Sequence, residues 1–325
     1  MGRLIDGHWN IEGLLPKDTG GKFVRQDASF RNWITADGSA GPSGEAGYKA
    51  ESGRYHLYVS LACPWAHRTL IFRQLKGLTD HISVDVVHPD MMDTGWSFQT
   101  DDGPAQGDTL FGSTHAYQIY QKADPNVNTR VTVPILWDKQ LGKIVSNESS
   151  EIIRMFNSAF DGITGNTADY WPEPMRADIE DVNERIYHTF NNGVYKSGFA
   201  TSQAAYTDAV TTLFDTLDWL EERLSHNRYP MGDRLTEADW RLFPTLVRFD
   251  SVYHLHFKCN RNRLIDFPNL WAYTRELYQM DGIAQTCNFD HIVRHYHYSH
   301  ESINPHRIIP INPRINWMEP HGRGT

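Results

Sequence analysis

Cys63 is the residue of this chain that is best placed for nucleophilic chemistry. It follows a strand-like run at residues 55–59 (YHLYV), whose bulky and β-branched side chains favour a pleated surface. A helical pattern comes next, with Pro64 at its first position and Gly77 at its end. A thiol at a helix N-terminus meets unpaired N–H groups and the positive end of the helix dipole. This setting favours the thiolate and can lower a cysteine pKa from ~8.5 into the range of about 3.5–7.5.

A buried structural role is the alternative for Cys63, because free cysteines are often interior. The order strand, Cys-Pro, helix favours the reactive thiol. The residue three positions later is Ala66, so the usual second cysteine of a redox pair is missing. We therefore expect an external thiol to resolve any mixed disulfide that forms on Cys63.

Length, charge and cysteine count narrow the class of protein. The 325 residues suggest two domains of roughly 100–200 residues each. The chain has 31 Lys and Arg against 40 Asp and Glu, a formal net charge of −9, which argues against nucleic acid as a main partner. No run approaches ~18 apolar residues, and no hydrophobic signal core precedes the body of the chain, so we expect no membrane partner. Three widely spaced cysteines are typical of a reducing compartment, and we predict a cytoplasmic protein.

The first part of the chain predicts an arm followed by an α/β domain. Residues 1–50 are expected to form an extended N-terminal arm. The strand at 55–59, the helix after Cys63 and a second strand at 82–87 form a βαβ unit, which implies a parallel pair. Residues 88–130 are polar and irregular, and we predict a long loop. Within it, Trp96 either takes part in binding a ligand or pins the loop to the body of the domain.

Pro134 interrupts a strand-like run at residues 130–137. Proline is excluded from paired central positions of a sheet, so it marks an edge or a turn. The Val-Pro step resembles the cis-proline loop of thioredoxin-like domains, and a cis bond there would be a deliberate feature of the structure. Val133 would then keep backbone groups free to pair with a peptide-like ligand as a short added strand. Residues 143–145 complete a hairpin.

Glu148 and Ser149 stand where the next helix begins. Ser and Glu at a helix start are ordinary capping residues, and capping is the interpretation that we favour. The alternative is anion capture, in which Ser149 and the nearby N–H groups of the helix N-terminus meet a carboxylate.

The second part of the chain has a helical pattern throughout. We predict a thioredoxin-like domain over residues 51–165, an all-helical domain over 172–298 and a C-terminal arm over 299–325. Thr236 and Asp239 form a capping pair at one helix start, and helices are also expected around 240–252 and 268–280. His291 and His295 share a helix face, but no further ligand spacing supports them, so we predict no metal.

A thioredoxin-like domain followed by an all-helical domain resembles the glutathione transferase fold. More narrowly, nearly the whole chain is similar to the glutathionyl-hydroquinone reductases, the Xi class of that superfamily, which is close to the omega class. The motifs that carry the resemblance are ACPWAHRT at 62–69, RVTVP at 130–134, SNES at 146–149, NNGVYK at 191–196, NFDH at 288–291 and PHGR at 320–323. One departure is Asn312, where the family usually has Gly; it concerns the arm and not the chemistry.

The resemblance implies a role for each site residue. Cys63 is the nucleophile and Tyr195 the proton donor, while Tyr253 and Tyr296 line the site, with Tyr253 assisting the thiolate. The residues that the resemblance assigns to glutathione are Trp96, Arg130, Val131, Thr132, Val133, Glu148 and Ser149. The residues alone give no signal for the three tyrosines, because the chain has fifteen and a structural role is the default for each.

The resemblance also implies a reaction and partners. Glutathione is a co-substrate, and glutathionyl-hydroquinones are reduced to hydroquinones through a mixed disulfide on Cys63, with release of oxidised glutathione. The partners are these small molecules, and the family implies a homodimer. An omega-like dehydroascorbate reductase or thioltransferase would share Cys63 and is the alternative function. A conjugating transferase would more often carry Ser or Tyr at this position, and a non-enzymatic scaffold would have no need of Cys63, Arg130 and Ser149.

Overall fold

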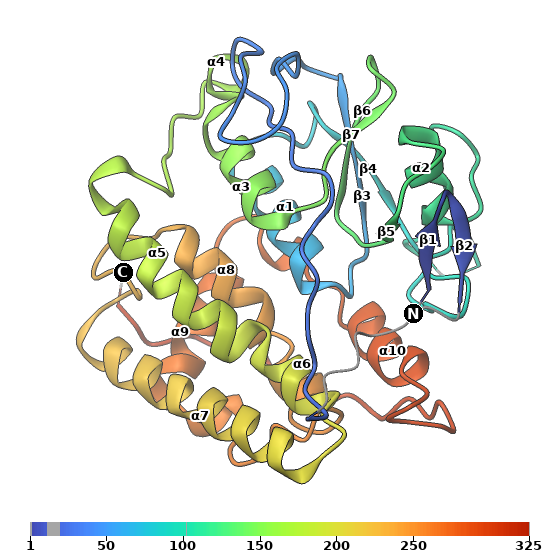
Figure 1. Cartoon of the computed structure of the whole chain (residues 1–325). Helices are drawn as coiled ribbons and strands as arrows, with labels where there is room; N and C mark the ends of the chain where they lie inside the picture. The colour runs from blue at the N-terminus through green and yellow to red at the C-terminus, as the bar shows by residue number, and fades with distance from the viewer. Residues whose placement is uncertain (1, 12–19, 102, 325) are drawn as a thin grey trace. The chain divides into compact units, whose positions relative to one another are not determined.

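The computed structural model describes residues 2–11, 20–101 and 103–324 (Figure 1). The described chain forms two compact units. The first unit is drawn from residues 1–15, 26–169 and 286–295, and the second from 16–25, 170–285 and 296–325. Each unit therefore combines segments that are distant in sequence. Residues 286–295, inside the span predicted as the helical domain, form part of the first unit.

A four-stranded mixed sheet lies at the centre of the first unit. Its strands are β3 (Tyr55–Val59), β4 (Ser83–Val86), β6 (Ile135–Asp138) and β7 (Lys143–Ser146), in the order β4-β3-β6-β7. β3 and β4 are parallel, which confirms the predicted βαβ unit, and β6 is antiparallel to both β3 and β7. Every residue of β3 and β6 is buried, as expected for the two central strands.

Helix α1 (Pro64–Leu75) connects β3 to β4 and packs against α3 (Ser149–Ser158) (Figure 1). Pro64 stands at the start of α1, where its missing N–H removes no helical hydrogen bond. Gly77 follows the end of α1 with φ +66°, a left-handed conformation that favours glycine. Both predicted boundaries of this helix are therefore confirmed. A short helix, α4 (Asp161–Thr164), follows α3.

The N-terminal arm starts with a β-hairpin, which corrects the extended conformation that we predicted for residues 3–10. β1 (Arg3–Ile5) and β2 (His8–Asn10) pair antiparallel, and β1 also pairs with β5 (Thr129–Arg130). The hairpin turns at Asp6-Gly7, where both residues have positive φ. Asp-Gly is the usual sequence of such a turn, but strands of three residues are too short to show an alternating pattern.

A second correction concerns the predicted loop at residues 88–130, because residues 116–123 are helical. α2 (Ala116–Ala123) buries Ala116, Ile119 and Tyr120, which share one face, and a capping box of His115 and Gln118 opens it. The helix was missed because it has only eight residues and follows a stretch rich in Gly and Asp. His is also not a usual capping residue.

The remainder of this segment is irregular but held by two buried carboxylates. Asp108 accepts hydrogen bonds from Tyr58 Oη (3.0 Å) and from backbone N–H groups of residues 110, 111 and 113. Asp85 accepts from Thr109 N at 2.7 Å and lies 3.2 Å from His56 Nε2. Burial favours the neutral form of Asp85, yet the hydrogen bonds from His56 and Thr109 hold its pKa below the usual value.

The second unit is helical in the part of the chain that the structure describes, as predicted. Its α-helices are α5 (Arg176–Ile186), α6 (Gly193–Gly198), α7 (Gln203–His226), α8 (Glu237–Leu246) and α9 (Pro268–Gln279). The shorter helical turns are η1 (Glu173–Met175), η2 (Tyr187–Asn191), η3 (Phe249–Tyr253), η4 (Leu264–Asp266) and η5 (Ala284–Thr286), the last of which crosses into the first unit at Thr286. α10 (Phe289–Ser299) is divided between the units after His295. Within the described ranges, none of the helices combines the length and apolar character needed to cross a bilayer.

Helix α8 starts as predicted and ends earlier than predicted. Thr236 N donates to Asp239 Oδ2 at 2.7 Å in a complete capping box, and Tyr273 Oη donates to Asp239 Oδ1 at 2.8 Å. Burial raises the pKa of Asp239 to about 7. The helix predicted around 240–252 is not continuous, because α8 ends at Leu246 and a π-helical turn, η3, follows. Pro244 lies inside α8 and cannot donate a helical hydrogen bond, which locally weakens the regular pattern.

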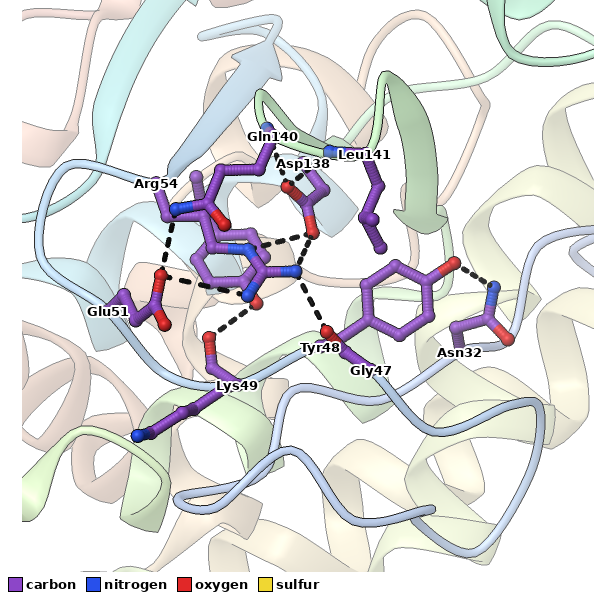
Figure 2. A network of polar contacts seen from close by, with 10 residues as sticks. Asn32, Gly47, Tyr48, Lys49, Glu51, Arg54, Asp138, Gln140 and Leu141 are labelled. Carbon is purple, nitrogen blue, oxygen red and sulfur yellow. Dashed lines mark hydrogen bonds and ion pairs between the residues drawn. The ribbon is translucent and has the colours of Figure 1, made fainter.

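A buried ion pair connects the end of the N-terminal arm to the sheet (Figure 2). Arg54 Nε and Nη2 donate to Asp138 Oδ2 at 2.9 and 2.5 Å, and Nη2 also donates to Gly47 O at 2.8 Å. Asp138 Oδ1 accepts from the backbone N–H groups of Gln140 and Leu141. Burial disfavours the guanidinium cation, but the hydrogen bonds to Asp138 raise the pKa of Arg54 overall.

We predict that Asp138→Ala destabilises the protein by about 3–5 kcal/mol, because it leaves the buried Arg54 cation without its partner. Chemical denaturation of the full chain would measure the loss. Asp266→Ala is the matched control, since it breaks the exposed ion pair with Arg263 and should leave the unfolding midpoint near that of the wild type. Equal midpoints for the two variants would contradict the assignment of Arg54–Asp138 as a stabilising pair.

Candidate active site

Cys63 is the N-cap residue of α1, with extended backbone angles of φ −76° and ψ 121°. Its side chain is half-buried, and its carbonyl accepts the hydrogen bond from His67 N that opens the helix. The thiol Sγ donates to Val133 O at 3.6 Å. The Val133–Pro134 peptide bond is cis, as predicted. The structure therefore brings the predicted nucleophile and the predicted cis-proline loop together.

Two local interactions act on the Cys63 thiol in opposite directions. The N-terminus of α1 stabilises a negative charge on the sulfur through its unpaired N–H groups and its dipole. The hydrogen bond to Val133 O is made only by the neutral thiol and is lost when the proton leaves. A ligand N–H that takes over this carbonyl would remove the interaction that favours the neutral form.

The loop before Pro134 is held by a buried tyrosine that the sequence patterns did not identify. Tyr120 Oη donates to Thr132 O at 2.9 Å and accepts from Thr132 N at 3.2 Å. Asn147 Nδ2 donates to the same Tyr120 oxygen at 3.0 Å. Tyr120 thus ties the cis-proline loop to α2 and to the turn before α3. Asn147 lies inside the SNES motif and could have been found from it, whereas Tyr120 sits on the helix that was missed.

The four predicted residues of the loop differ in exposure. Arg130, Val131 and Thr132 are half-buried, and Val133 is buried. Arg130 ends strand β5, where it pairs with Arg3 of β1. The backbone of residues 130–133 therefore continues from the edge strand β5 into the cis-proline turn. Its half-buried side chains lie at the Arg130 end, and Val133 is buried.

Glu148 is the N-cap of α3, as the capping interpretation predicted. Its Oε1 accepts hydrogen bonds from Ser150 N at 2.9 Å and from Ser150 Oγ at 2.8 Å. Ser149 is the first residue of α3 and is buried. The carboxylate of Glu148 therefore already caps one N–H group of this helix start. Anion capture by Ser149 and the nearby N–H groups stays a prediction.

Trp96 is buried against α10, within the first unit. Its ring stacks on His295 with 4.7 Å between centroids and 24° between planes, and its carbonyl accepts from Ala116 N. Asp90 forms an ion pair with Arg294 on the same helix. Trp96 therefore pins the long segment to α10, as one of its two interpretations predicted, and a role in binding glutathione stays a prediction.

The three predicted tyrosines form one chain of hydroxyl groups in the second unit. Tyr195 Oη lies 2.5 Å from Tyr296 Oη, which lies 3.0 Å from Tyr253 Oη. They come from α6, α10 and η3, and their exposed fractions are 9%, 1% and 0%, so Tyr195 is the least buried of the three. Gly198 allows α6 to pass close to this cluster, because a Cβ there would stand 2.1 Å from the Phe257 ring.

Loss of the proton from Tyr195 would make the hydrogen bonds of the hydroxyl chain all point towards Tyr195. Burial raises the pKa of both Tyr253 and Tyr296 well above the usual value; the charge of Tyr195 raises both pKa values further, and Arg248 opposes this. Tyr296, in the middle, has one proton to donate. If Tyr195 becomes a phenolate, Tyr296 can donate to it while Tyr253 donates to Tyr296. The hydroxyl chain therefore supports a negative charge on Tyr195.

The histidines of α10 do not assemble a metal site in the described residues. No group of three or more His, Cys, Asp or Glu side chains within these ranges is arranged to hold an ion. His295 contacts Pro89 O through Nδ1 at 2.8 Å and stacks on Trp96, which gives it a role in packing.

Comparison with protein families matches both parts of the chain. Residues 62–159 match the model of the glutathione S-transferase N-terminal domain, and residues 203–276 match that of the C-terminal domain. The chain is 56% identical over 323 residues to the glutathionyl-hydroquinone reductase YqjG of Escherichia coli, covering 99% of this chain and 98% of that protein. It is 50% identical over 313 residues to the glutathionyl-hydroquinone reductase PcpF of Sphingobium chlorophenolicum, covering 96% of each.

Solved structures give the same result. The glutathione-bound structure of Escherichia coli YqjG matches with a TM-score of 0.93 and covers 99% of both chains, and the Xi-class transferase of Natrialba magadii matches with a TM-score of 0.92 at 45% identity, covering 99% of this chain and 97% of that one. The predicted fold is thereby confirmed. This chain belongs to the glutathione transferase family, in the group that contains the glutathionyl-hydroquinone reductases and the Xi-class transferases.

Proposed function

We propose that this protein is a glutathione-dependent glutathionyl-hydroquinone reductase. The observation that carries the proposal is the 56% identity to a named reductase of this class over 99% of the chain. The position of Cys63 at the start of α1, beside the cis-proline loop, agrees with it chemically. The proposal also makes the protein a cytoplasmic homodimer that needs no metal ion. The family resemblance supports the homodimer, and three cysteines that form no disulfide support a reducing compartment.

Glutathione binds along the first unit in this proposal. The residues that hold it are Trp96, Arg130, Val131, Thr132, Val133, Glu148 and Ser149. The match to a glutathione-bound structure over nearly the full chain supports this set. Val133 offers its backbone to the peptide, and its carbonyl is the group that now accepts the Cys63 thiol. Arg130 and the N-terminus of α3 offset the carboxylates of the tripeptide.

The first step transfers glutathione to the enzyme. The Cys63 thiolate attacks the sulfur of a glutathionyl-hydroquinone, a sulfur–sulfur bond forms and the bond between sulfur and the aromatic carbon breaks. The electron pair of the broken bond remains on the ring carbon, which takes a proton from Tyr195. The products are the hydroquinone, the Cys63–glutathione disulfide and the Tyr195 phenolate, which the hydroxyl chain of Tyr296 and Tyr253 supports.

The second step restores the enzyme. A free glutathione thiol loses its proton, which returns to the Tyr195 phenolate, and the resulting thiolate attacks the glutathione sulfur of the mixed disulfide. Oxidised glutathione leaves, and Cys63 is released as a thiolate. An external thiol is required because Ala66 occupies the position at which a resolving cysteine would stand.

We expect Cys63→Ala to abolish reduction of glutathionyl-hydroquinones, because no other group in the scheme accepts glutathione. Turnover assays would measure the loss, and intact mass spectrometry should show one glutathione adduct on the wild type and none on the variant. Cys287→Ser is the matched control, since Cys287 is also a half-buried cysteine of the first unit that forms no disulfide and should be dispensable. Turnover by Cys63→Ala would refute the scheme.

Alkylation of the native protein tests the electrostatic argument directly. Because a helix N-terminus favours the thiolate, the rate for Cys63 should reach half its maximum at a pH below ~8.5 and remain fast near neutrality. Cys259 should stay unmodified, since it is fully buried and burial raises its pKa to about 12. A half-maximal rate for Cys63 at the pH of an ordinary cysteine would overturn this account of its reactivity.

Tyr195→Phe should slow hydroquinone release by about 10²- to 10⁴-fold, the usual contribution of a general acid. Exchange with a simple glutathione disulfide should change much less, because its leaving group is a thiolate that needs no carbon protonation. Comparing the two rates also separates the proposed reaction from the omega-like thioltransferase alternative. Tyr187→Phe, on the preceding turn η2, is the control, and a loss of the same size there would remove the special role of Tyr195.

A further inference from the structure

Residues 20–25 of the N-terminal arm pack on the helix that carries Tyr195, within the second unit; we call them the arm segment. The ring of Phe23 stacks on the rings of Tyr195 and Phe199, with centroid distances of 6.3 and 5.7 Å. Tyr195 is therefore covered on one side by a segment from the far end of the sequence.

Arg25 closes the arm segment and is fixed at two points near Tyr195. Its guanidinium carbon lies 5.1 Å from the centroid of the Tyr195 ring and 5.7 Å from that of Phe23. Its Nε donates to Asn192 Oδ1 at 2.6 Å. Asn192 is buried and precedes α6 by one residue, so it lies about one helical turn from Tyr195.

A cation at this place acts on the charge of Tyr195 and not only on its position. A guanidinium near the face of an aromatic ring is attracted by the electrons of the ring. The attraction grows when the phenol becomes a phenolate, because the ring then carries a negative charge. Two further cations of the second unit have contacts of their own: Arg248 partly offsets the rise that burial causes in the pKa of Tyr253 and of Tyr296, and Lys196 donates to His188 O.

We infer that Arg25 is a positioning residue for the reduction of glutathionyl-hydroquinones, which holds Tyr195 and stabilises its phenolate as the proton passes to the leaving ring carbon. This inference rests on the proposed function, in which Tyr195 is the proton donor. The hydroxyl chain supports the phenolate oxygen through Tyr296, and Arg25 supports the ring from the arm segment. The N-terminal arm thereby contributes to the chemistry of the second unit.

The test measures kcat and KM for hydroquinone release with the full-length chain. Arg25→Gln should lower kcat by about 2- to 30-fold, the range of a cation–ring interaction, with KM little changed. Arg25→Lys should recover part of the loss, because it keeps the charge but lacks the planar fork that reaches Asn192. Lys22→Gln removes a charge from an exposed position of the same segment and should leave kcat unchanged.

The decisive comparison repeats Arg25→Gln in a Tyr195→Phe background. If Arg25 acts through the phenolate, the second substitution adds no further loss once the donor is gone. A packing role alone would lower kcat by the same factor in both backgrounds, and that result would overturn the inference. A normal kcat for Arg25→Gln beside a slow Tyr195→Phe would also overturn it while leaving the proposed function intact. Wild-type release by Tyr195→Phe would reject the assigned role of Tyr195 and the inference together.

Discussion

The contact between the Cys63 sulfur and the carbonyl of Val133 is the constraint on which the first unit depends. It follows from strand register, because β3 and β6 are antiparallel neighbours with Tyr58 opposite Ile135. The residues that follow β3 must therefore lie beside the residues that precede β6. Cys63 and Val133 meet in this way although 70 positions separate them in the chain. A change in register would move the thiol to another carbonyl and separate it from the cis-proline turn.

The same contact makes the state of the thiol depend on what occupies the cis-proline loop. The helix N-terminus favours the anion, and the carbonyl of Val133 favours the neutral thiol. In the proposed function, a peptide that pairs with Val133 would shift this balance towards the thiolate when the nucleophile is needed. The buried side chains of Tyr120 and Asn147 hold the loop that carries this carbonyl through the hydrogen bonds of Tyr120 to Thr132.

Signals between residues that are close in sequence allowed a large part of the fold to be predicted. Features that depend on residues far apart in sequence were missed for the same reason. The turn at Cys63, the cis bond before Pro134 and the capping box at Thr236 are each set by residues within a few positions of one another. The hydroxyl chain is different, because Tyr195 and Tyr296 are 101 residues apart and neither lies in a pattern that points to the other. The resemblance to a family supplied the tyrosines, and only the structure connected them.

The contact between Arg25 and Asn192 could not be predicted from local sequence either, because 167 residues separate the two. The arm segment has only six residues, half of them exposed, so its composition indicates nothing about the residue that it covers. Helix α2 and the hairpin at residues 3–10 were missed for a related reason: elements of three to eight residues show too few periods for a pattern to emerge. Their stability comes from partners elsewhere in the chain and not from their own sequence.

In the proposed mechanism, the division of the chain into two units corresponds to a division of the chemistry. Thiol exchange at Cys63 uses the helix start that stabilises its thiolate, and this helix belongs to the first unit. Release of an aromatic carbon requires a proton, and the groups suited to supply and replace it belong to the second unit. A thioltransferase needs only the first set, because a departing thiolate is stable without a proton. In the proposed mechanism, the hydroxyl chain is therefore the feature of this protein that distinguishes hydroquinone release from simple disulfide exchange.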